Sequence, residues 1–311
     1  MRVLFVMDPI ERIDIEADST FVLMLESQVR GFEVDVASIQ DLYLYGSMVG
    51  VRARSVTVQR IRGRHARIGS FEDRPLDEYL AIFMRKDPPI DVDYHLATLV
   101  LDRVDRSRVK MVNEPQALRD FNEKLAALRW AEFMPPTLAT ADRLRLIDFV
   151  DQHGPCVVKP LVNAGGEGIV RLERRDKNTR SVIDLLTQNG TRMIEAQKFL
   201  PDVSKGDKRV ILVNGEAIGA INRVPSESDI RANMHVGGRA EASQMTKRDH
   251  EICEAMGPEL RRRGLVFVGI DVIGGFLTEV NITSPTGLQE LARFDGIYGE
   301  QKILDWVMGK N

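Results

Sequence analysis

Residues 268–281, VGIDVIGGFLTEVN, are the stretch of sequence that decides the fold. Two apolar runs flank a Gly-Gly pair, which predicts an antiparallel hairpin. Asp271 interrupts the first run, and Glu279 and Asn281 stand two positions apart on the second. A lone carboxylate buried among Val and Ile costs several kcal/mol unless a partner or a metal compensates it. We therefore expect these three oxygen-bearing side chains to converge on a positive charge.

The register of the hairpin decides whether the three side chains share one face. Side chains alternate faces along a strand, so Glu279 and Asn281 lie on the same side. A two-residue loop would pair Asp271 with Thr278 and turn Glu279 to the opposite face. A three-residue loop that takes in Phe276 pairs Asp271 with Glu279, and we predict that register. Oxygen donors of this kind suit Mg²⁺ bound together with substrate phosphates. The alternative is a hairpin with satisfied polar groups on a solvent face.

Composition and charge narrow the class of protein. The chain has 311 residues, 43% of them apolar and 29% charged, with a net charge of -3. This length is enough for two or three subdomains. The near-balance of charge argues against a nucleic-acid partner, which asks for a basic excess. Six arginines between residues 52 and 67 are predicted to line the solvent face of two antiparallel strands.

Cysteine usage and apolar segments point to a cytoplasmic protein. Cys156 and Cys253 form no CxxC or His/Cys cluster, which fits a reducing compartment. The apolar start is interrupted by Asp8-Pro9, too early for a signal peptide. No window approaches the ~20 apolar residues of a membrane span, so we expect no membrane partner.

The chain opens with a predicted β-α-β unit. We expect a strand over Arg2–Met7, a helix over Ser19–Arg30 that ends at Gly31, and a strand over Glu33–Ala37. No glycine lies between the first strand and Gly31, which argues against a GxGxxG fingerprint and a nicotinamide dehydrogenase.

A further strand, residues 80–84, ends at Arg85-Lys86, where ligands bind in open α/β sheets. A surface turn closed by two prolines is the alternative. A short strand over 109–112 and a helix over Pro115–Glu132 are expected to follow. The remaining chain predicts strands at 156–159, 168–172 and 193–197, helices at 179–186 and 247–263, and a hairpin at 209–221 with an Asn-Gly turn. The fold class is therefore α/β.

Two lysines and a glycine loop are candidates for binding phosphate. Lys159 ends an apolar strand and precedes Pro160, and residues 163–168 read NAGGEG. Backbone N–H groups of such a loop can approach phosphate oxygens, so Lys159 and the glycines can bind a polyphosphate from two sides. The alternatives are a glycine turn that serves hairpin geometry alone and a solvent-facing lysine. Lys124, early in the predicted helix, has a solvated lysine as its default interpretation.

Two further segments carry polar groups at strand ends. Residues 195–201 end a strand and then break, and such ends often expose backbone groups that read an adenine edge. Asp207, Lys208 and Arg209 open the next strand, and a ribose hydroxyl, a phosphate or a carboxylate can find a partner there. An ordinary charged loop is the alternative.

The order of these pieces resembles the ATP-grasp fold: helix lysine, strand lysine, glycine loop, hinge strand, then Asp, Glu and Asn on a late hairpin. The chain further resembles bacterial glutathione synthetases along nearly its whole length. The matching stretches are Val6–Pro9, Asp18–Thr20, Met84–Pro89, Asn122–Leu125, Gly206–Val210, Gly237–Arg239, Val268–Asp271 and Asn281–Thr286.

This resemblance implies a fold, a reaction and a set of roles. It implies an N-terminal open α/β substrate-binding domain over 1–121, a central ATP-grasp lid over 122–200 and a C-terminal ATP-grasp domain over 201–311. It implies ligation of γ-glutamylcysteine to glycine through an acyl phosphate, with ATP and Mg²⁺, or Mn²⁺ in its place, in a cytoplasmic homo-oligomer. The implied ATP-binding residues are Lys124, Lys159, Gly165, Gly166, Glu195, Gln197, Lys198 and Asp207. The implied metal ligands are Asp271, Glu279 and Asn281. The implied substrate-binding residues are Arg85, Arg209, Arg223, Ser284, Pro285 and Thr286, and the implied catalytic residues are Arg209, Arg223 and Arg239.

One stretch departs from the family pattern. The family reads Lys-Pro-Leu-Asp-Gly ahead of its Gly-Gly pair, whereas residues 159–163 read KPLVN. Asn tolerates left-handed backbone angles, so the turn is expected to survive without the acidic residue. An acyl phosphate must be kept from water, and residues 225–241, with Arg231 and Arg239, are the predicted lid. The rival functions are an ATP-grasp ligase with another acceptor and a non-catalytic ATP-binding regulator.

Overall fold

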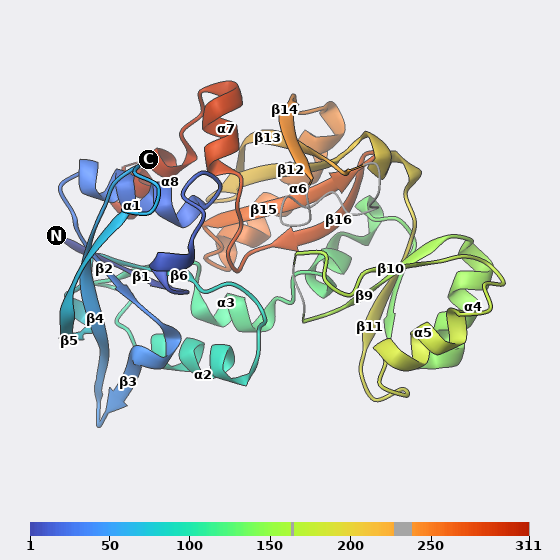
Figure 1. The fold of residues 1–311 in the computed structure, drawn as a ribbon, viewed down its shortest axis with the longest axis horizontal. Coiled ribbons are helices and arrows are strands. Elements are labelled where there is room, and N and C mark those ends of the chain that lie inside the picture. Colours follow the sequence, from blue (N-terminus) through green and yellow to red (C-terminus); the bar gives the residue numbers. More distant parts are fainter. Residues whose placement is uncertain (163–164, 227–237, 311) are drawn as a thin grey trace.

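The fold is described by a computed structural model, which covers residues 1–162, 165–226 and 238–310 (Figure 1). Its strands form a seven-stranded, a four-stranded and a five-stranded sheet. Each sheet lies within one of the predicted domains, 1–121, 122–200 and 201–311, whose boundaries stay a prediction. Within the described ranges, no helix combines the length and apolar character needed to cross a bilayer.

The first sheet contains the predicted β-α-β unit. Strand β1 (Arg2–Met7) pairs in parallel with β2 (Glu33–Ala37) and with β6 (Ala81–Arg85). Helix α1 (Ser19–Val29) connects the first two strands and begins at Asp18, whose carboxylate accepts the Phe21 N–H at 2.8 Å. The sheet is completed by β3 (Leu42–Tyr45), β4 (Met48–Val58), β5 (Ala66–Pro75) and β7 (Lys110–Val112), and helix α2 (Val92–Leu101) follows β6.

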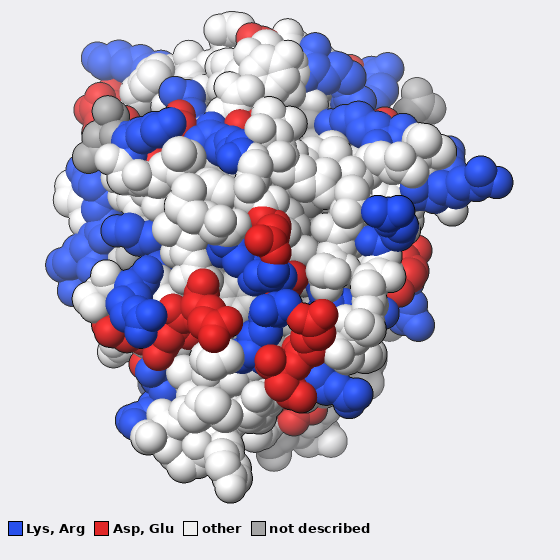
Figure 2. All heavy atoms as spheres, turned by 90° about the vertical axis from the view of Figure 1, so that its left-hand side faces the viewer, with Lys and Arg blue, Asp and Glu red and all other residues white. Residues whose placement is uncertain are grey.

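The first and last arginines of the arginine-rich segment, Arg52, Arg54 and Arg67, lie on two antiparallel strands of this sheet, as predicted. Strands β4 and β5 are antiparallel, and the guanidinium groups of Arg52 and Arg54 lie 4.7 and 5.0 Å from the centre of the Phe71 ring. Arg60, Arg62 and Arg64 lie in the connection between the two strands instead of on them. Figure 2 shows acidic side chains interspersed among the basic ones on this side of the molecule.

The predicted helix over Pro115–Glu132 is wrong as one element. The structure has α3 (Pro115–Asp120) and then a 3-10 helix (Leu125–Phe133), with a turn between them. The Asn122 side chain accepts the N–H groups of Lys124 at 3.2 Å and Leu125 at 3.1 Å. An Asn side chain that bonds to nearby backbone competes with helix continuation, which accounts for the break. Lys124 therefore lies in a turn and not along a helix.

The second sheet is ordered β10-β9-β11-β8. Its strands are β8 (Thr137–Thr140), β9 (Cys156–Pro160), β10 (Val170–Leu172) and β11 (Ile194–Lys198). Helices α4 (Arg143–His153) and α5 (Thr179–Leu186) pack on this sheet through a buried cluster that includes Leu146, Val158 and Ile183 (Figure 1). Antiparallel pairing of β9 with β11 sets Lys159 opposite Glu195.

The third sheet is ordered β14-β13-β12-β15-β16 and carries helices on both faces. Val210 and Leu212 of β12 belong to the core cluster that contains α6, whereas Ile211 belongs to the cluster of α7 and α8. The predicted turn at Asn214-Gly215 is present, with positive φ at both residues. The elements are β12 (Asp207–Val213), β13 (Glu216–Val224), β14 (Arg239–Ser243), α6 (Lys247–Arg262), β15 (Phe267–Ile273), β16 (Phe276–Asn281), α7 (Leu288–Asp295) and α8 (Gly299–Val307).

The last helix returns to the start of the chain. Helix α8 packs against α1, and Arg30 donates to the Asp305 carboxylate at 2.7 Å and to the Gln301 carbonyl at 3.0 Å. Figure 1 shows the C-terminal end beside the N-terminal sheet. The first and last elements therefore share one core.

The deciding hairpin has the predicted pairing but reaches it by another route. Asp271 pairs with Glu279, as predicted, yet Ile273 pairs with Phe276 across a two-residue turn. The three-residue loop is therefore wrong. A β-bulge at Thr278 supplies the extra residue, and the Thr278 hydroxyl donates to the Asp271 carbonyl at 3.1 Å. A bulge inserts one residue on one strand, which restores Glu279 to the face of Asp271.

Candidate functional site

A cleft lies between the second and third sheets and collects most of the predicted site residues. It encloses about 1020 Å³ including its open mouth, the size range of a nucleotide site. Strands β9 and β11 supply one wall, and β12, β13, β15 and β16 supply the other. Its polar lining includes Lys124, Lys159, Gln197, Lys198, Asp207, Arg209, Arg223, Asp271, Glu279 and Asn281.

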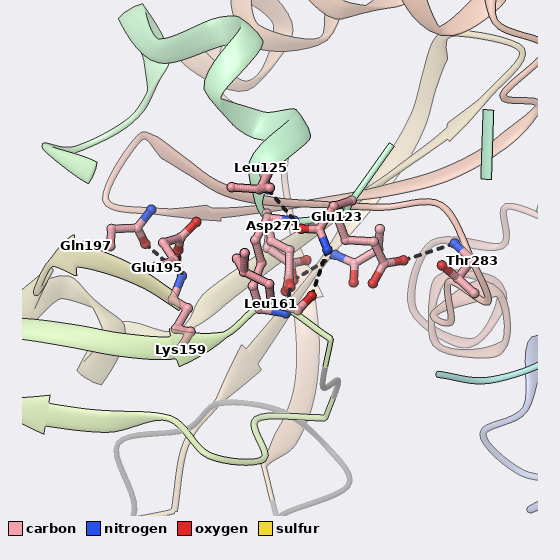
Figure 3. Close-up of polar contacts among 12 residues, drawn as sticks. Glu123, Leu125, Lys159, Leu161, Glu195, Gln197, Asp271 and Thr283 are labelled. Carbon is pink, nitrogen blue, oxygen red and sulfur yellow. Dashed lines mark hydrogen bonds and ion pairs between the residues drawn. The ribbon is translucent and has the colours of Figure 1, made fainter. Parts of the chain in front are cut away.

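Lys159 forms the polar centre of the wall made by the second sheet (Figure 3). Its Nζ lies 2.9 Å from Glu195 Oε1 and donates to Gln197 Oε1 at 2.9 Å. Glu195 is fully buried and does not itself line the cleft. Its Oε1 is paired with the Lys159 ammonium, whereas its Oε2 has no hydrogen-bond partner among the described residues. Glu195 therefore reaches the cleft only through Lys159.

The strand end after β11 contributes an apolar pocket. Val157, Ile169, Phe199 and Leu200 line the cleft beside Lys198. The N–H groups of residues 198 and 199 donate to the carbonyls of residues 136 and 155, at 2.9 and 2.8 Å. These two donors are thus committed to the protein, and the apolar side chains are suited to a flat ring.

Gly165 and Gly166 line the mouth of the same cleft with positive φ values of 67° and 80°. The start of the predicted glycine loop, residues 163–164, lies outside the described residues. The predicted lid over 225–241 falls mainly on residues 227–237, which also lie outside them, and Arg231 is among these. Arg239 is described: its side chain is 77% exposed on β14, pairs with Glu241 and does not line the cleft.

Lys124 and Glu279 meet on the opposite wall, with Nζ and Oε1 3.0 Å apart. Burial disfavours the Lys124 ammonium, but Glu279 outweighs it and raises the pKa of Lys124. Burial likewise favours neutral Glu279, but Lys124 outweighs it and lowers the pKa of Glu279. Both groups are therefore charged at neutral pH.

Asp271 is surrounded by cations. Arg209 donates from Nε to Oδ1 at 2.5 Å and from Nη2 to Oδ2 at 3.1 Å, and Arg223 Nη2 lies 3.0 Å from Oδ2. Burial alone would favour the neutral acid, but the two arginines hold the pKa of Asp271 well below its ordinary value. Asn281 donates its amide to Oδ2 at 3.1 Å. Asp271 thus faces two arginines, whereas Asn281 faces Asp271 itself. Convergence of all three side chains on one positive charge stays a prediction.

Asp207 has a different environment from Asp271. Its Oδ2 accepts from Arg223 at 2.6 Å, while Oδ1 is buried without a hydrogen-bond partner among the described residues. Burial, only partly offset by Arg223, raises the pKa of Asp207 to about 7. A buried acceptor with spare capacity beside the apolar pocket can bind a hydroxyl group.

The substrate residues predicted outside the hairpin lie next to it. Arg85 is buried at the end of β6, where its Nη2 donates to the Pro285 carbonyl at 2.9 Å and its Nε to Thr20 Oγ1 at 3.0 Å. Burial lowers the pKa of Arg85. Arg209 Nη1 donates to the Thr286 carbonyl at 3.4 Å. Arg85 and the turn over 284–286 are thus adjacent, but neither lines the cleft.

The donor set at the hairpin suits a hard divalent cation. Asp271, Glu279 and Asn281 lie on one face of the β15–β16 hairpin and all line the cleft. Two carboxylates and an amide oxygen are the ligand types that Mg²⁺ takes together with phosphate oxygens and water. No cluster of three or more His, Cys, Asp or Glu that could bind a metal occurs in the described residues, so this mixed set is the candidate.

Sequence reasoning missed two residues that hold the site in place. Glu123 accepts the N–H groups of Ile282 and Thr283, and Asn113 exchanges hydrogen bonds with the backbone of Phe267 and donates to that of Ile282. Glu123 stands in the stretch NEKL, which was interpreted only through its lysine. Its partners lie 159 and 160 positions further along the chain, so no local pattern signals this role.

Family models match almost the entire chain. The model of the prokaryotic glutathione synthetase N-terminal domain matches residues 1–119, and that of the prokaryotic glutathione synthetase ATP-grasp domain matches residues 123–296. A glutathione synthetase of Thermosynechococcus vestitus is 42% identical over 316 residues, covering 99% of both chains. A glutathione synthetase of Brucella melitensis biotype 1 is 42% identical over 296 residues, covering 95% of both chains.

Solved structures show the same fold at low sequence identity. The D-cycloserine synthetase DcsG has a TM-score of 0.66 at 15% identity, with 98% of this chain and 99% of that chain covered. The ATP-grasp ligase PsnB with its precursor peptide and AMPPNP has a TM-score of 0.63 at 19% identity, with 99% and 96% covered. These likenesses show the ATP-grasp fold, as predicted.

Proposed function

The chain belongs to the prokaryotic glutathione synthetase family and is an ATP-dependent ligase that forms glutathione, and we propose that the cleft between the second and third sheets is its active site. The observation that carries this proposal is the meeting, in one cleft, of two lysines with a hairpin that presents two carboxylates and an amide. The cleft thus contains both the cations that a triphosphate needs and the oxygen ligands that a metal needs.

ATP is proposed to lie along the cleft from the second sheet toward the hairpin. The apolar side chains near Phe199 would hold the adenine, and Gln197 and Lys198 would stand at its polar edge. Glu195 would contribute from behind the cleft wall through its pair with Lys159. Asp207, with its unpaired Oδ1, would accept a ribose hydroxyl. Lys159 and Lys124 would neutralise the phosphates, and Gly165 and Gly166 would approach them with backbone N–H groups.

The divalent cation is proposed to be Mg²⁺, with Mn²⁺ able to replace it, held by Asp271, Glu279 and Asn281. When bound, it would offset charge on the phosphates and orient them for in-line transfer. The lysines and arginines of the cleft would also offset charge on the phosphates. Fixed charges stabilise a transition state more strongly in a cleft than in bulk water.

The proposed reaction is that of the family, with these residues in its steps. The cysteinyl carboxylate of γ-glutamylcysteine attacks the γ-phosphorus, which forms an acyl phosphate and releases ADP. The glycine amine then attacks the acyl carbon and forms the amide bond. The bond from that carbon to the bridging oxygen breaks, phosphate leaves with this oxygen and the electron pair, and the amine loses a proton to water. Arg209 and Arg223 are proposed to stabilise the carboxylate and the developing charge, with Arg85 and the turn over 284–286 shaping the peptide site. Arg239 is proposed as a further catalytic residue on the family relationship alone, because its side chain lies outside the cleft.

Isotope transfer tests this assignment. γ-Glutamylcysteine labelled with ¹⁸O in its cysteinyl carboxylate is incubated with the enzyme, ATP, Mg²⁺ and glycine, and the released phosphate is analysed by mass spectrometry. One label per phosphate is expected, because that oxygen bridges carbon and phosphorus. Unlabelled phosphate would exclude the acyl phosphate. If Asp271→Asn released labelled phosphate as fast as the wild-type enzyme, the assignment of the active site would be excluded.

Three further properties are proposed on the family relationship. The small-molecule partners are γ-glutamylcysteine and glycine, with no nucleic-acid or membrane partner. The enzyme is proposed to act in the cytoplasm as a homo-oligomer. Sedimentation of the purified protein at several concentrations tests the last point, because a single species of about one chain mass would contradict it.

A further inference from the structure

Glu123 lies in the turn between α3 and the 3-10 helix, buried against the segment that follows β16 (Figure 3). Its Oε1 accepts the N–H groups of Ile282 at 2.9 Å and Thr283 at 3.0 Å. Its own carbonyl accepts the N–H of Val280 at 3.0 Å. A single residue thus holds backbone amides on both sides of Asn281.

The next residue, Lys124, contacts the same segment through the side chain of Glu279. Lys124 Nζ lies 3.0 Å from Glu279 Oε1, and one peptide bond joins Lys124 to Glu123. A shift of the segment away from Glu123 would therefore change the separation of Lys124 from both Glu279 and Asn281.

The carbonyl groups of this segment are held by other residues. Asn113 donates to the Ile282 carbonyl at 2.7 Å, Arg85 to that of Pro285 and Arg209 to that of Thr286. Glu123 supplies the acceptor for the N–H groups at the start of the segment. Its side chain thus fixes residues 282 and 283, which join the hairpin to the turn over 284–286.

Both backbone N–H groups donate to the same oxygen, Glu123 Oε1. Burial, together with the like charge of Glu279, raises the pKa of Glu123 above its ordinary value. The contact therefore depends on an acceptor oxygen held at this place and not on a charge.

We propose that Glu123 is a positioning residue for the ligation: it fixes the backbone around Asn281 and so sets where Lys124 stands relative to Glu279 and Asn281. The inference rests on the proposed assignment of those three residues to the ATP phosphates and the metal. Glu123 touches no substrate; it acts through the residues that do.

Three variants separate positioning from charge and from folding. Glu123→Met removes the acceptor, whereas Glu123→Gln keeps an oxygen that can accept both N–H groups. Glu290→Met is the matched control, because Glu290 is also buried, at 2% exposure, and lies outside the cleft. Each variant is assayed for kcat and KM of ATP, for Mn²⁺ binding by electron paramagnetic resonance with AMPPNP, and for thermal unfolding.

Glu123→Met is expected to lower kcat about 100-fold, as a shift of about 1 Å in a reacting group does. Mn²⁺ binding with AMPPNP should weaken by about 10-fold, the usual effect of losing a residue that orients metal ligands. Glu123→Gln should stay within about 10-fold of the wild-type kcat, and Glu290→Met should leave kcat and Mn²⁺ binding unchanged.

Two results would overturn the inference: a folded Glu123→Met with kcat within about threefold of wild type, or a Glu123→Gln as impaired as Glu123→Met. If Glu123→Met does not fold, Glu123→Asp decides, because it keeps the charge but is one methylene too short for both amides; wild-type kcat there counts against positioning. Failure of the site assignment is a distinct outcome, because the Asp271→Asn variant would then bind Mn²⁺ as tightly as the wild-type enzyme does.

Discussion

Lys124 and Glu279 form an ion pair at 3.0 Å, so a lysine proposed for phosphate is held by a carboxylate proposed for the metal. Under the proposed assignment, binding of ATP with its cation would exchange this pair for a lysine–phosphate and a carboxylate–metal pair. Asp271 and Arg209 repeat the arrangement at 2.5 Å. Each of these two carboxylates is therefore already paired with a cation from the protein itself.

Removal of one partner of this pair should destabilise the protein. Lys124→Met leaves Glu279 without its cation, and we expect the free energy of unfolding to fall by about 2 kcal/mol; a quarter of the Glu279 side chain is exposed, so the loss is below that of a fully buried pair. The double variant with Glu279→Gln should recover most of it. Urea unfolding measures both; Lys247→Met, at a 94% exposed lysine, is the control that should change nothing.

Asp271→Asn should abolish most turnover while the fold remains. We expect kcat to fall more than about 100-fold, because the substitution removes a charge from the centre of the site. Circular dichroism and ADP release under saturating Mg²⁺ check the two parts. Asp249→Asn is the matched control: Asp249 is buried and paired with Lys208 at 2.7 Å, but lies outside the cleft. Near-normal turnover in Asp271→Asn would remove the metal assignment.

Arg223→Lys should impair the enzyme although it keeps the charge. Arg223 Nη2 lies 2.6 Å from Asp207 Oδ2 and 3.0 Å from Asp271 Oδ2, while its Nε donates to the Asp207 carbonyl at 3.4 Å. Two nitrogens of one guanidinium thus make these contacts together, which the single nitrogen of a lysine does not reproduce. We expect kcat/KM for γ-glutamylcysteine to fall about 10-fold or more, while Arg30→Lys, outside the cleft, leaves it unchanged. Steady-state kinetics with each substrate varied in turn provides the measurement.

Glu300 should make stability depend on pH. Burial raises the pKa of Glu300 above its ordinary 4.5, and its Oε2 has no hydrogen-bond partner among the described residues. Its contribution is fully present below pH 4.5 and is lost as the pH rises through the raised folded-state value. Glu300→Gln should therefore gain stability over wild type at pH 8 and lose that advantage at pH 4.5. Equal differences at both pH values, from urea unfolding, would contradict this account.

The sequence predicted much of the fold because its signals were local. The strand over Arg2–Met7 is a continuous apolar run, and the turn at Asn214-Gly215 has the residues that positive φ requires. The break after Asp120 was missed because helix propensity continues through it, while the Asn122 side chain diverts the backbone. A short-range competition of this kind leaves no periodic signal.

The site was predicted in part and for different reasons. Pairing of Asp271 with Glu279 was correct, but the bulge at Thr278 that produces it has no distinct sequence pattern. Glu123 was missed because its partners lie 159 and 160 positions away. Contacts at that separation are set by tertiary packing, which a single sequence does not report.

The return of α8 to α1 has a consequence for how the molecule comes apart. Arg30 donates hydrogen bonds to Asp305 and Gln301 of the last helix, outside the cleft. Removal of helix α8 by cutting the chain before residue 299 should expose the apolar surface that it covers and unfold the N-terminal domain, whereas cleavage in a surface loop should not. The two ends of the chain are thus expected to unfold together, so destabilising one end should destabilise the other.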